Sequence, residues 1–212
     1  MFITFEGVEG CGKSSVLSKV YDELKKDGYD VIQTREPGGV KIGEEIRKIL
    51  LDKENTMMDK RTEALLFAAS RRQHLIEKVW PALQENKIVL SDRFIDSSLA
   101  YQGGGDEIGV DEVLKINLFA TENTFPDLTI LFDIDPRIGL ARINKNSSRE
   151  INRLDVKEIE FYDKIRATFL ELAKKYSNRF VVIDANRSFN EVCQNVLNII
   201  KEKIKWSIML NI

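Results

Sequence analysis

The chain has few of the residues that mark a disulfide scaffold, a metal site or a nucleic-acid-binding surface. Its 212 residues include two cysteines, Cys11 and Cys193, and one histidine. The cysteines lack metal-ligand spacing and Cys11 lies inside a glycine-rich loop, so we expect no structural disulfide and a reducing compartment. A near balance of 32 basic and 34 acidic residues argues against a surface devoted to non-specific nucleic-acid binding.

Targeting and membrane signals are also missing from the sequence. The N-terminus has no basic segment followed by an apolar one, so no secretory signal is visible. No apolar stretch is long enough to span a bilayer. We therefore expect a cytoplasmic protein without nucleic-acid or membrane partners. A length of 212 residues suits one domain with a sizeable core.

Short apolar runs alternate with amphipathic segments along the chain, which is typical of an α/β fold. Strands are expected at residues 2–6, 30–34, 87–91, 128–133 and 180–184. Helices are expected at residues 13–27, 42–51, 61–79, 110–120, 136–143, 156–175 and 189–205. This order predicts a five-stranded parallel sheet with helices on both faces, in one domain of residues 1–212. The loop at 144–153 and the glycine run at 103–105 are expected to be mobile.

A glycine-rich loop follows the first expected strand, at the edge of the sheet where ligands bind. Residues 7–14, GVEGCGKS, match the phosphate-binding pattern G-x-x-x-x-G-K-S. Its backbone N–H groups can hold phosphate, while Lys13 can reach the outer phosphates and Ser14 can hold Mg²⁺. We expect a nucleoside triphosphate to contact Gly7, Val8, Glu9, Gly10, Cys11, Gly12, Lys13, Ser14 and Ser15.

The third strand is followed by Asp92 and Arg93. An acidic residue at this place in a phosphate-loop protein commonly orients Mg²⁺, often through water. Arg93 could bridge two phosphoryl groups and neutralise charge during transfer. Asp133 and Asp135 compete for the metal role, although helix capping before Pro136 is the favoured explanation of these acids. We favour Asp92, because polar and aromatic residues follow it closely.

Two further segments could hold a second ligand or could be ordinary structure. Arg35 begins the turn R-E-P-G-G, and its guanidinium suits phosphate, although an exposed arginine on a surface turn fits equally well. Phe67 and Arg71 are four residues apart and so share a helical face. The ring could stack on a flat ligand, but spacing alone favours core packing. The only histidine, His74, has no evident partner of a catalytic type and is expected on a helix surface.

Basic residues gather between the fourth and fifth strands, at Arg142, Lys145, Arg149 and Arg153. A mobile lid of residues 142–154 could close over the triphosphate, exclude water and stabilise the transferring charge. A solvated loop would carry the same charges. The phosphate-binding loop earlier in the chain favours the lid.

Taken together, these segments resemble the thymidylate kinase family, in its bacterial type, among the P-loop nucleoside monophosphate kinases. The resemblance rests on five features in the family's order: the glycine loop, REPGG at 35–39, LLFAASR at 65–71, DRFIDSSLAYQ at 92–102 and an arginine-bearing lid. The matching order and spacing extend from about residue 2 to about residue 190. Each motif alone is moderately specific, whereas the ordered set is highly specific.

The resemblance implies roles for individual residues. Phe67 would stack on thymine, Arg71 would bond a thymine carbonyl, and Tyr101 would crowd the ribose 2′ position. The implied dTMP-binding residues are Glu9, Arg35, Pro37, Phe67, Arg71, Arg93, Ser97, Ser98, Tyr101 and Gln102. The implied catalytic residues are Lys13, Asp92, Arg93, Arg149 and Arg153, with Arg142 on the ATP side and Ser14 and Asp92 at Mg²⁺. A homodimer formed by helix packing is also implied.

The reaction so implied is transfer of the γ-phosphoryl group of ATP to dTMP, giving dTDP and ADP. The attacking group is already an anionic phosphate oxygen, so the absence of a catalytic histidine is no objection. Two alternatives stay open: a kinase for another nucleotide, such as guanylate, and a GTP-dependent switch. The switch is disfavoured because the Asn-Lys at 144–145 lacks the acid of the guanine-binding motif N-K-x-D.

The sequence also departs from the family at three places. Cys11 stands where alanine is common, and Ser70 replaces a usual Asp or Asn. The lid reads N-R-L-D at 152–155 where the family more often has D-R-I-E, so Arg153 is kept but its partner acid is missing.

Overall fold

The structure, a computed structural model, describes residues 1–144 and 158–210. Its sheet is parallel and has five strands in the order β2-β3-β1-β4-β5. The strands are β1 (Phe2–Glu6), β2 (Val31–Arg35), β3 (Ile88–Asp92), β4 (Leu128–Asp133) and β5 (Phe180–Asp184). The predicted fold is confirmed, with the second and third strands each shifted by one residue.

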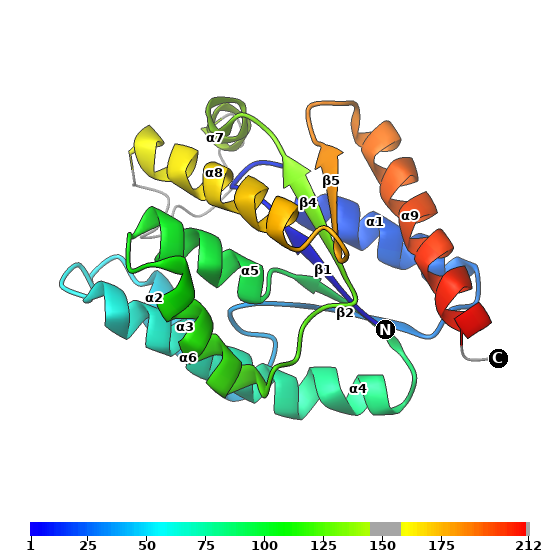
Figure 1. Cartoon of the computed structure of the whole chain (residues 1–212), viewed down its shortest axis with the longest axis horizontal. Coiled ribbons are helices and arrows are strands. Elements are labelled where there is room, and N and C mark those ends of the chain that lie inside the picture. Colours follow the sequence, from blue (N-terminus) through cyan, green and yellow to red (C-terminus); the bar gives the residue numbers. More distant parts are fainter. Residues whose placement is uncertain (145–157, 211–212) are drawn as a thin grey trace.

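Helices cover both faces of the sheet (Figure 1). Helix α1 (Lys13–Lys26) packs against α9 (Phe189–Leu210) on one side, and α8 (Ile159–Lys175) lies on the other. The remaining helices are α2 (Lys41–Leu51), α3 (Lys60–His74), α4 (Trp80–Gln84), α5 (Ile95–Ser98), α6 (Val110–Thr121) and α7 (Pro136–Asn144). The helix expected at 61–79 is divided, because a π-helical segment, Leu75–Val79, follows α3.

The central strands form the core of the molecule. Every residue of β1 is buried, and the Phe5 ring stacks on Phe132 of β4 with their centroids 5.8 Å apart. Burial on both faces is what a parallel sheet covered by helices requires, and it explains why these strands are continuous apolar runs. The parallel register pairs Asp92 with both Phe5 and Arg35, so the ends of β1, β2 and β3 meet at one edge.

The glycine run at 103–105 is packed rather than mobile, so that expectation is wrong. It lies in a second π-helical segment, Leu99–Gly105, in which Gly103 and Gly105 are buried. A Cβ on Gly104 would stand 2.0 Å from Oγ1 of Thr168 in α8. The glycines therefore allow α8 to pack closely against the backbone of this segment. A run of glycines in a sequence is also typical of flexible loops, so the sequence alone could not tell the two apart.

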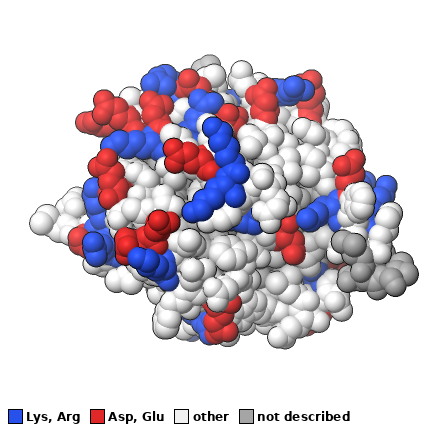
Figure 2. All heavy atoms as spheres, viewed as in Figure 1, with Lys and Arg blue, Asp and Glu red and all other residues white. Residues whose placement is uncertain are grey.

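The molecular surface in the same view mixes charges of both signs. Figure 2 shows basic and acidic side chains lying next to one another rather than gathering by sign. No helix among the described residues is long and apolar enough to cross a membrane.

Candidate active site

The glycine loop joins β1 to α1 in the conformation that its sequence demands. Gly10 and Gly12 have φ angles of 70° and 89°, in the left-handed region that favours glycine. A Cβ on Gly10 would lie 2.0 Å from the carbonyl oxygen of Gly139 in α7, so no other residue fits there. Helix α1 begins at Lys13, and its N-terminal end therefore opens onto the loop.

A cavity of about 560 Å³ lies beside this loop. It brings together most of the residues predicted for the two ligands. On the loop side it is lined by Glu9, Gly10, Gly12, Lys13, Ser14, Ser15, Asp92 and Arg142. On the other side it is lined by Arg35, Pro37, Phe67, Arg71, Arg93, Ser97, Ser98, Tyr101 and Gln102.

The remaining predicted residues do not line this cavity or are not described. Gly7 and Val8 border a small hollow behind the loop, beside Phe132. Cys11 is buried, and burial raises the pKa of its thiol, so the side chain acts as a small apolar group. The predicted lid residues Arg149 and Arg153 lie outside the described residues.

The three acids proposed for the metal role differ in their partners. The Ser14 hydroxyl donates a hydrogen bond to the Asp92 carboxylate on the cavity wall. Asp133 instead accepts from Nε and Nη2 of Arg166 at 2.7 and 2.9 Å. Asp135 accepts from the backbone N–H of Arg137 at 2.8 Å and so caps α7, as the capping interpretation predicted. A hydroxyl and a carboxylate together are a fitting ligand pair for Mg²⁺.

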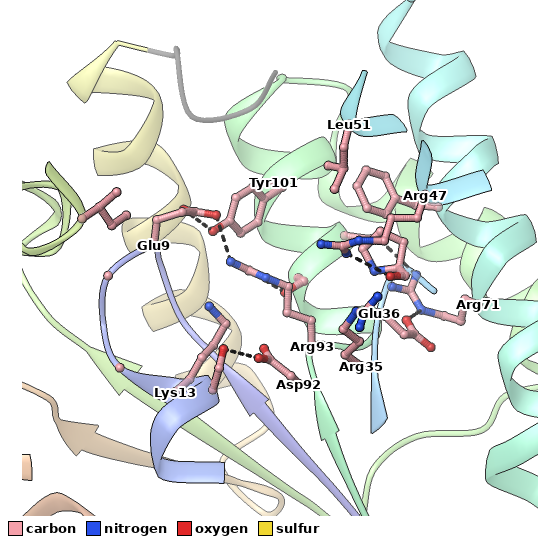
Figure 3. A pocket seen from close by; sticks show the side chains of 18 of the residues that line it. Glu9, Lys13, Arg35, Glu36, Arg47, Leu51, Arg71, Asp92, Arg93 and Tyr101 are labelled. Carbon is pink, nitrogen blue, oxygen red and sulfur yellow. Dashed lines mark hydrogen bonds and ion pairs between the residues drawn. The ribbon is translucent and has the colours of Figure 1, made fainter. Parts of the chain in front are cut away.

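Arg93 lies at the centre of the cavity, between the loop and the opposite wall (Figure 3). Its Nη2 donates to Oε1 of Glu9 at 2.9 Å and its Nη1 to Oγ of Ser97 at 3.0 Å. Its guanidinium stands 4.7 Å from the centroid of the Tyr101 ring. Burial works against the charge of Arg93, but the neighbouring Tyr101, Glu9 and other acids outweigh it and raise its pKa. The guanidinium is therefore a fixed positive charge.

A buried carboxyl behind the cavity, Glu6, holds the segment that carries Arg93. Its two oxygens accept from the backbone N–H of Phe94 at 2.7 Å and from Oγ of Ser97 at 2.5 Å. Burial, and then the nearby Asp96, raise the pKa of Glu6 to about 8. An acid at the end of a mostly apolar strand was a visible signal, but its partner Ser97 is 91 residues away in the sequence.

Arg71 forms the far wall of the cavity and is almost completely bonded within the protein. Its Nε donates to Oε2 of Glu36 at 2.8 Å, and its Nη2 donates to the carbonyl of Phe94 at 2.9 Å. Its Nη1 donates to Oγ of Ser98 at 3.0 Å and to Oδ1 of Asn117. A guanidinium has five N–H groups, so one, on Nη2, keeps no partner among the described residues. Phe67, one turn earlier on α3, lines the same cavity.

Two residues near this wall escaped sequence reasoning. Arg47 and Leu51 reach the cavity from α2, and Nη1 of Arg47 donates to the carbonyl of Pro37 at 3.0 Å. Burial, and then the nearby Arg35, lower the pKa of Arg47. Basic residues on the helix after the REPGG turn were a signal that could have been used. Arg35 itself pairs with Glu44 at 2.8 and 2.9 Å and stays half-exposed beside the cavity.

The prediction that His74 lies on a helix surface is wrong. Its side chain is 0% exposed. Its Nδ1 lies 2.9 Å from Oε1 of Glu36, and its Nε2 lies 2.7 Å from Oγ1 of Thr34. Thr34 lies near the end of β2 and Glu36 directly follows that strand. They are 40 and 38 residues away from His74 in the sequence, so no local pattern on α3 could reveal them.

The fold and the cavity together define a class of protein. A parallel sheet, a glycine loop leading into a helix, and a Ser–Asp pair beside it form a P-loop nucleotide-binding site. The second wall, with Arg71 and Phe67, adds room for a second ligand, which is the arrangement of a P-loop nucleotide kinase.

Comparisons with known proteins identify the family. A family model described as thymidylate kinase matches residues 5–196. A thymidylate kinase of Bacillus velezensis is 53% identical over 205 residues, covering 97% of each chain. One of Geobacillus sp. (strain WCH70) is 52% identical over 204 residues, covering 96% of this chain and 97% of that protein. The crystal structure of thymidylate kinase from Ehrlichia chaffeensis matches with a TM-score of 0.77 and 33% identity, covering 95% and 98% of the two chains.

The chain belongs to the thymidylate kinase family. It is accordingly an ATP-dependent nucleoside monophosphate kinase, a transferase of nucleotide biosynthesis. The predicted resemblance and the predicted function as a thymidylate kinase are confirmed.

Proposed function

We propose that the cavity binds ATP at its loop side and dTMP at its Arg71 side, and that the γ-phosphoryl group passes between them beside Arg93. One observation carries this assignment: a single cavity connects the phosphate-binding loop with the Phe67–Arg71 wall, and Arg93 stands between them. Alignment of the two substrates and neutralisation of their charge are the main contributions to such a transfer. The products are dTDP and ADP.

The first experiment is ADP release from ATP with each nucleoside monophosphate supplied separately. Strong stimulation by dTMP, weaker stimulation by dUMP and almost none by GMP, AMP or CMP is expected. Stimulation by another monophosphate would keep the kinase but refute the roles given to Phe67, Arg71 and Ser98. Stimulation by none would favour a nucleotide-dependent binding protein.

Mg²⁺ is proposed as the metal of the reaction. The Ser14 hydroxyl and the Asp92 carboxylate would hold it, in part through water, and it would neutralise charge on the ATP phosphates. The contact between Ser14 and Asp92 supports this choice, since it places both oxygen ligands on the same wall. Arg142 lines the cavity on this side.

Arg149 and Arg153 are proposed as additional cations of the lid. The chain is also proposed to be cytoplasmic.

Removal of Arg71 is expected to weaken dTMP use more than ATP use. The Arg71→Ala change takes away a guanidinium that lines the cavity, so the KM for dTMP should rise about tenfold or more while the KM for ATP changes by less than about twofold. It also leaves Glu36 without its buried partner charge, and so lowers stability. Arg71→Lys keeps a charge opposite Glu36 and serves as the folded control. Steady-state kinetics with each substrate varied measures both constants, and an equal rise in both would contradict the assignment.

A homodimer is proposed through α3 and α6, which pack against each other. Each leaves a large apolar side chain in solvent: Phe119 of α6 is 90% exposed and Leu65 of α3 is 55% exposed. Exposed apolar groups of this size commonly mark an interface. The Phe119→Asp variant should therefore shift the chain toward the monomer, as measured by sedimentation velocity. Met57→Asp, which changes a residue 94% exposed outside these helices, should not, and an unchanged mass for Phe119→Asp would oppose this interface.

A further inference from the structure

A chain of buried polar groups runs from β2 to the wall of the cavity. Oγ1 of Thr34 contacts Nε2 of His74 at 2.7 Å, and Nδ1 of His74 contacts Oε1 of Glu36 at 2.9 Å. Oε2 of Glu36 then accepts from Nε of Arg71 at 2.8 Å. All four residues are buried. Because a carboxylate only accepts hydrogen bonds, the Nδ1 of His74 carries a hydrogen and donates it to Glu36.

This row of hydrogen-bonded side chains is shielded from solvent at its Thr34–His74 end. A Cβ on Gly39 would lie 2.8 Å from Oγ1 of Thr34 and 3.1 Å from Cδ2 of His74, so the REPGG turn packs directly on both side chains. The N–H of Gly38 donates to Oγ of Ser70, at 3.2 Å, on the same helix as His74. No reacting group can therefore reach Thr34 or His74, and what they do must act through Glu36 and Arg71, which line the cavity.

Glu36 uses both of its carboxylate oxygens, one for each partner. Without His74, Oε1 would be a buried acceptor with no partner, and the carboxylate could turn to find another. Any turn would move Oε2 away from Nε of Arg71. The guanidinium is planar, so a change at Nε also redirects Nη2, which keeps one N–H without a partner among the described residues. Arg71 lines the cavity.

We propose that His74 is a positioning residue for the acceptor base: it holds the Glu36 carboxylate, and Glu36 in turn fixes the orientation of Arg71. The inference rests on the proposed use of Arg71 in binding the acceptor. His74 touches neither substrate. The effect of His74 on substrate binding is therefore confined to the acceptor side. Its side chain is buried, so packing has to be separated from positioning by experiment.

Two replacements of His74 separate positioning from simple packing. An asparagine amide reaches the place of Nδ1, so His74→Asn can keep the hydrogen bond to Glu36. A glutamine amide reaches the place of Nε2, so His74→Gln keeps a polar group beside Thr34 and loses Glu36. We expect the KM for dTMP to rise about tenfold in His74→Gln and less than about threefold in His74→Asn, with the KM for ATP unchanged in both.

A double variant tests whether the effect passes through Arg71. In the Arg71→Ala background, adding His74→Gln should change the KM for dTMP by less than about twofold, because the group being positioned is gone. A purely structural role would instead leave the two changes additive and would move the KM for ATP as well. Thr34 lies at the end of the hydrogen-bonded row farthest from Arg71. Thr34→Val should raise the KM for dTMP about threefold and provides a second folded variant.

The outcomes distinguish this inference from the function it rests on. An unchanged KM for dTMP in Arg71→Ala would refute the role of Arg71 and the inference with it. A raised KM in Arg71→Ala together with an unchanged KM in His74→Gln would refute the positioning role of His74 alone. Equal effects of His74→Asn and His74→Gln would also refute it, since only one of them keeps the bond to Glu36.

Discussion

The Lys13→Ala variant is expected to lose about 10³-fold in kcat and to remain folded. Lys13 lines the cavity at the N-terminus of α1, and among the described residues no carboxylate forms a salt bridge with it. Its charge is therefore left for the ATP phosphates, where negative charge shifts during transfer. Coupled measurement of ADP production at saturating ATP and dTMP gives kcat directly.

Lys19, on the exposed face of the same helix, provides the matched control. Its Nζ pairs with Glu23 at 2.9 Å, one turn along the helix and away from the cavity. An exposed pair of this kind contributes little to stability, so Lys19→Ala should keep both wild-type activity and a wild-type melting temperature. Near-normal transfer by Lys13→Ala would overturn the proposed mechanism, and unfolding of that variant alone would show that Lys13 has a structural role.

The loop around Lys13 was predictable because its information is local. Gly10 and Gly12 need special backbone angles within a few residues of Lys13, and the apolar runs on either side mark the strand and the helix. The order of β1, loop and α1 then places Lys13 at the ligand edge of a parallel sheet. The same reasoning placed Asp92 and Arg93 at this edge, where both line the cavity, since Asp92 ends the strand β3 and Arg93 follows it.

The residues that support the site could not be found in this way. His74 lies on a helix whose spacing suggests nothing about Thr34 or Glu36, because these partners lie 38 to 40 residues earlier in the chain. Asn117 reaches Arg71 from α6, 46 residues later. Such contacts depend on how helices pack on the sheet, and that packing has no short-range sequence pattern. Sequence reasoning therefore located the residues facing the cavity better than those behind it.

Replacement of Arg93 by lysine is expected to lower kcat about 10²-fold, although the positive charge remains. Arg93 reaches two neighbours at once, Glu9 at 2.9 Å and Ser97 at 3.0 Å, with the two ends of a planar fork. A lysine ammonium is a single point charge and cannot hold both contacts while bridging two phosphoryl groups. The backbone of Arg93 has a φ of 71°, in the left-handed region. Lysine is similar to arginine in length, so this replacement changes the side-chain chemistry at that position with little change in side-chain size.

The control for Arg93→Lys is Arg35→Lys, because both arginines line the cavity and only Arg93 stands at its centre. Arg35 is half-exposed, paired with Glu44 and on the acceptor side of the cavity. Arg35→Lys should therefore mainly raise the KM for dTMP. A fall in kcat for Arg93→Lys with a rise in KM for Arg35→Lys would separate a group acting in the transition state from one that only binds substrate. If Arg93→Lys instead raised only the KM for dTMP, Arg93 would be a binding residue, and neutralisation of the transferred phosphoryl group would have to come from Lys13 and the lid.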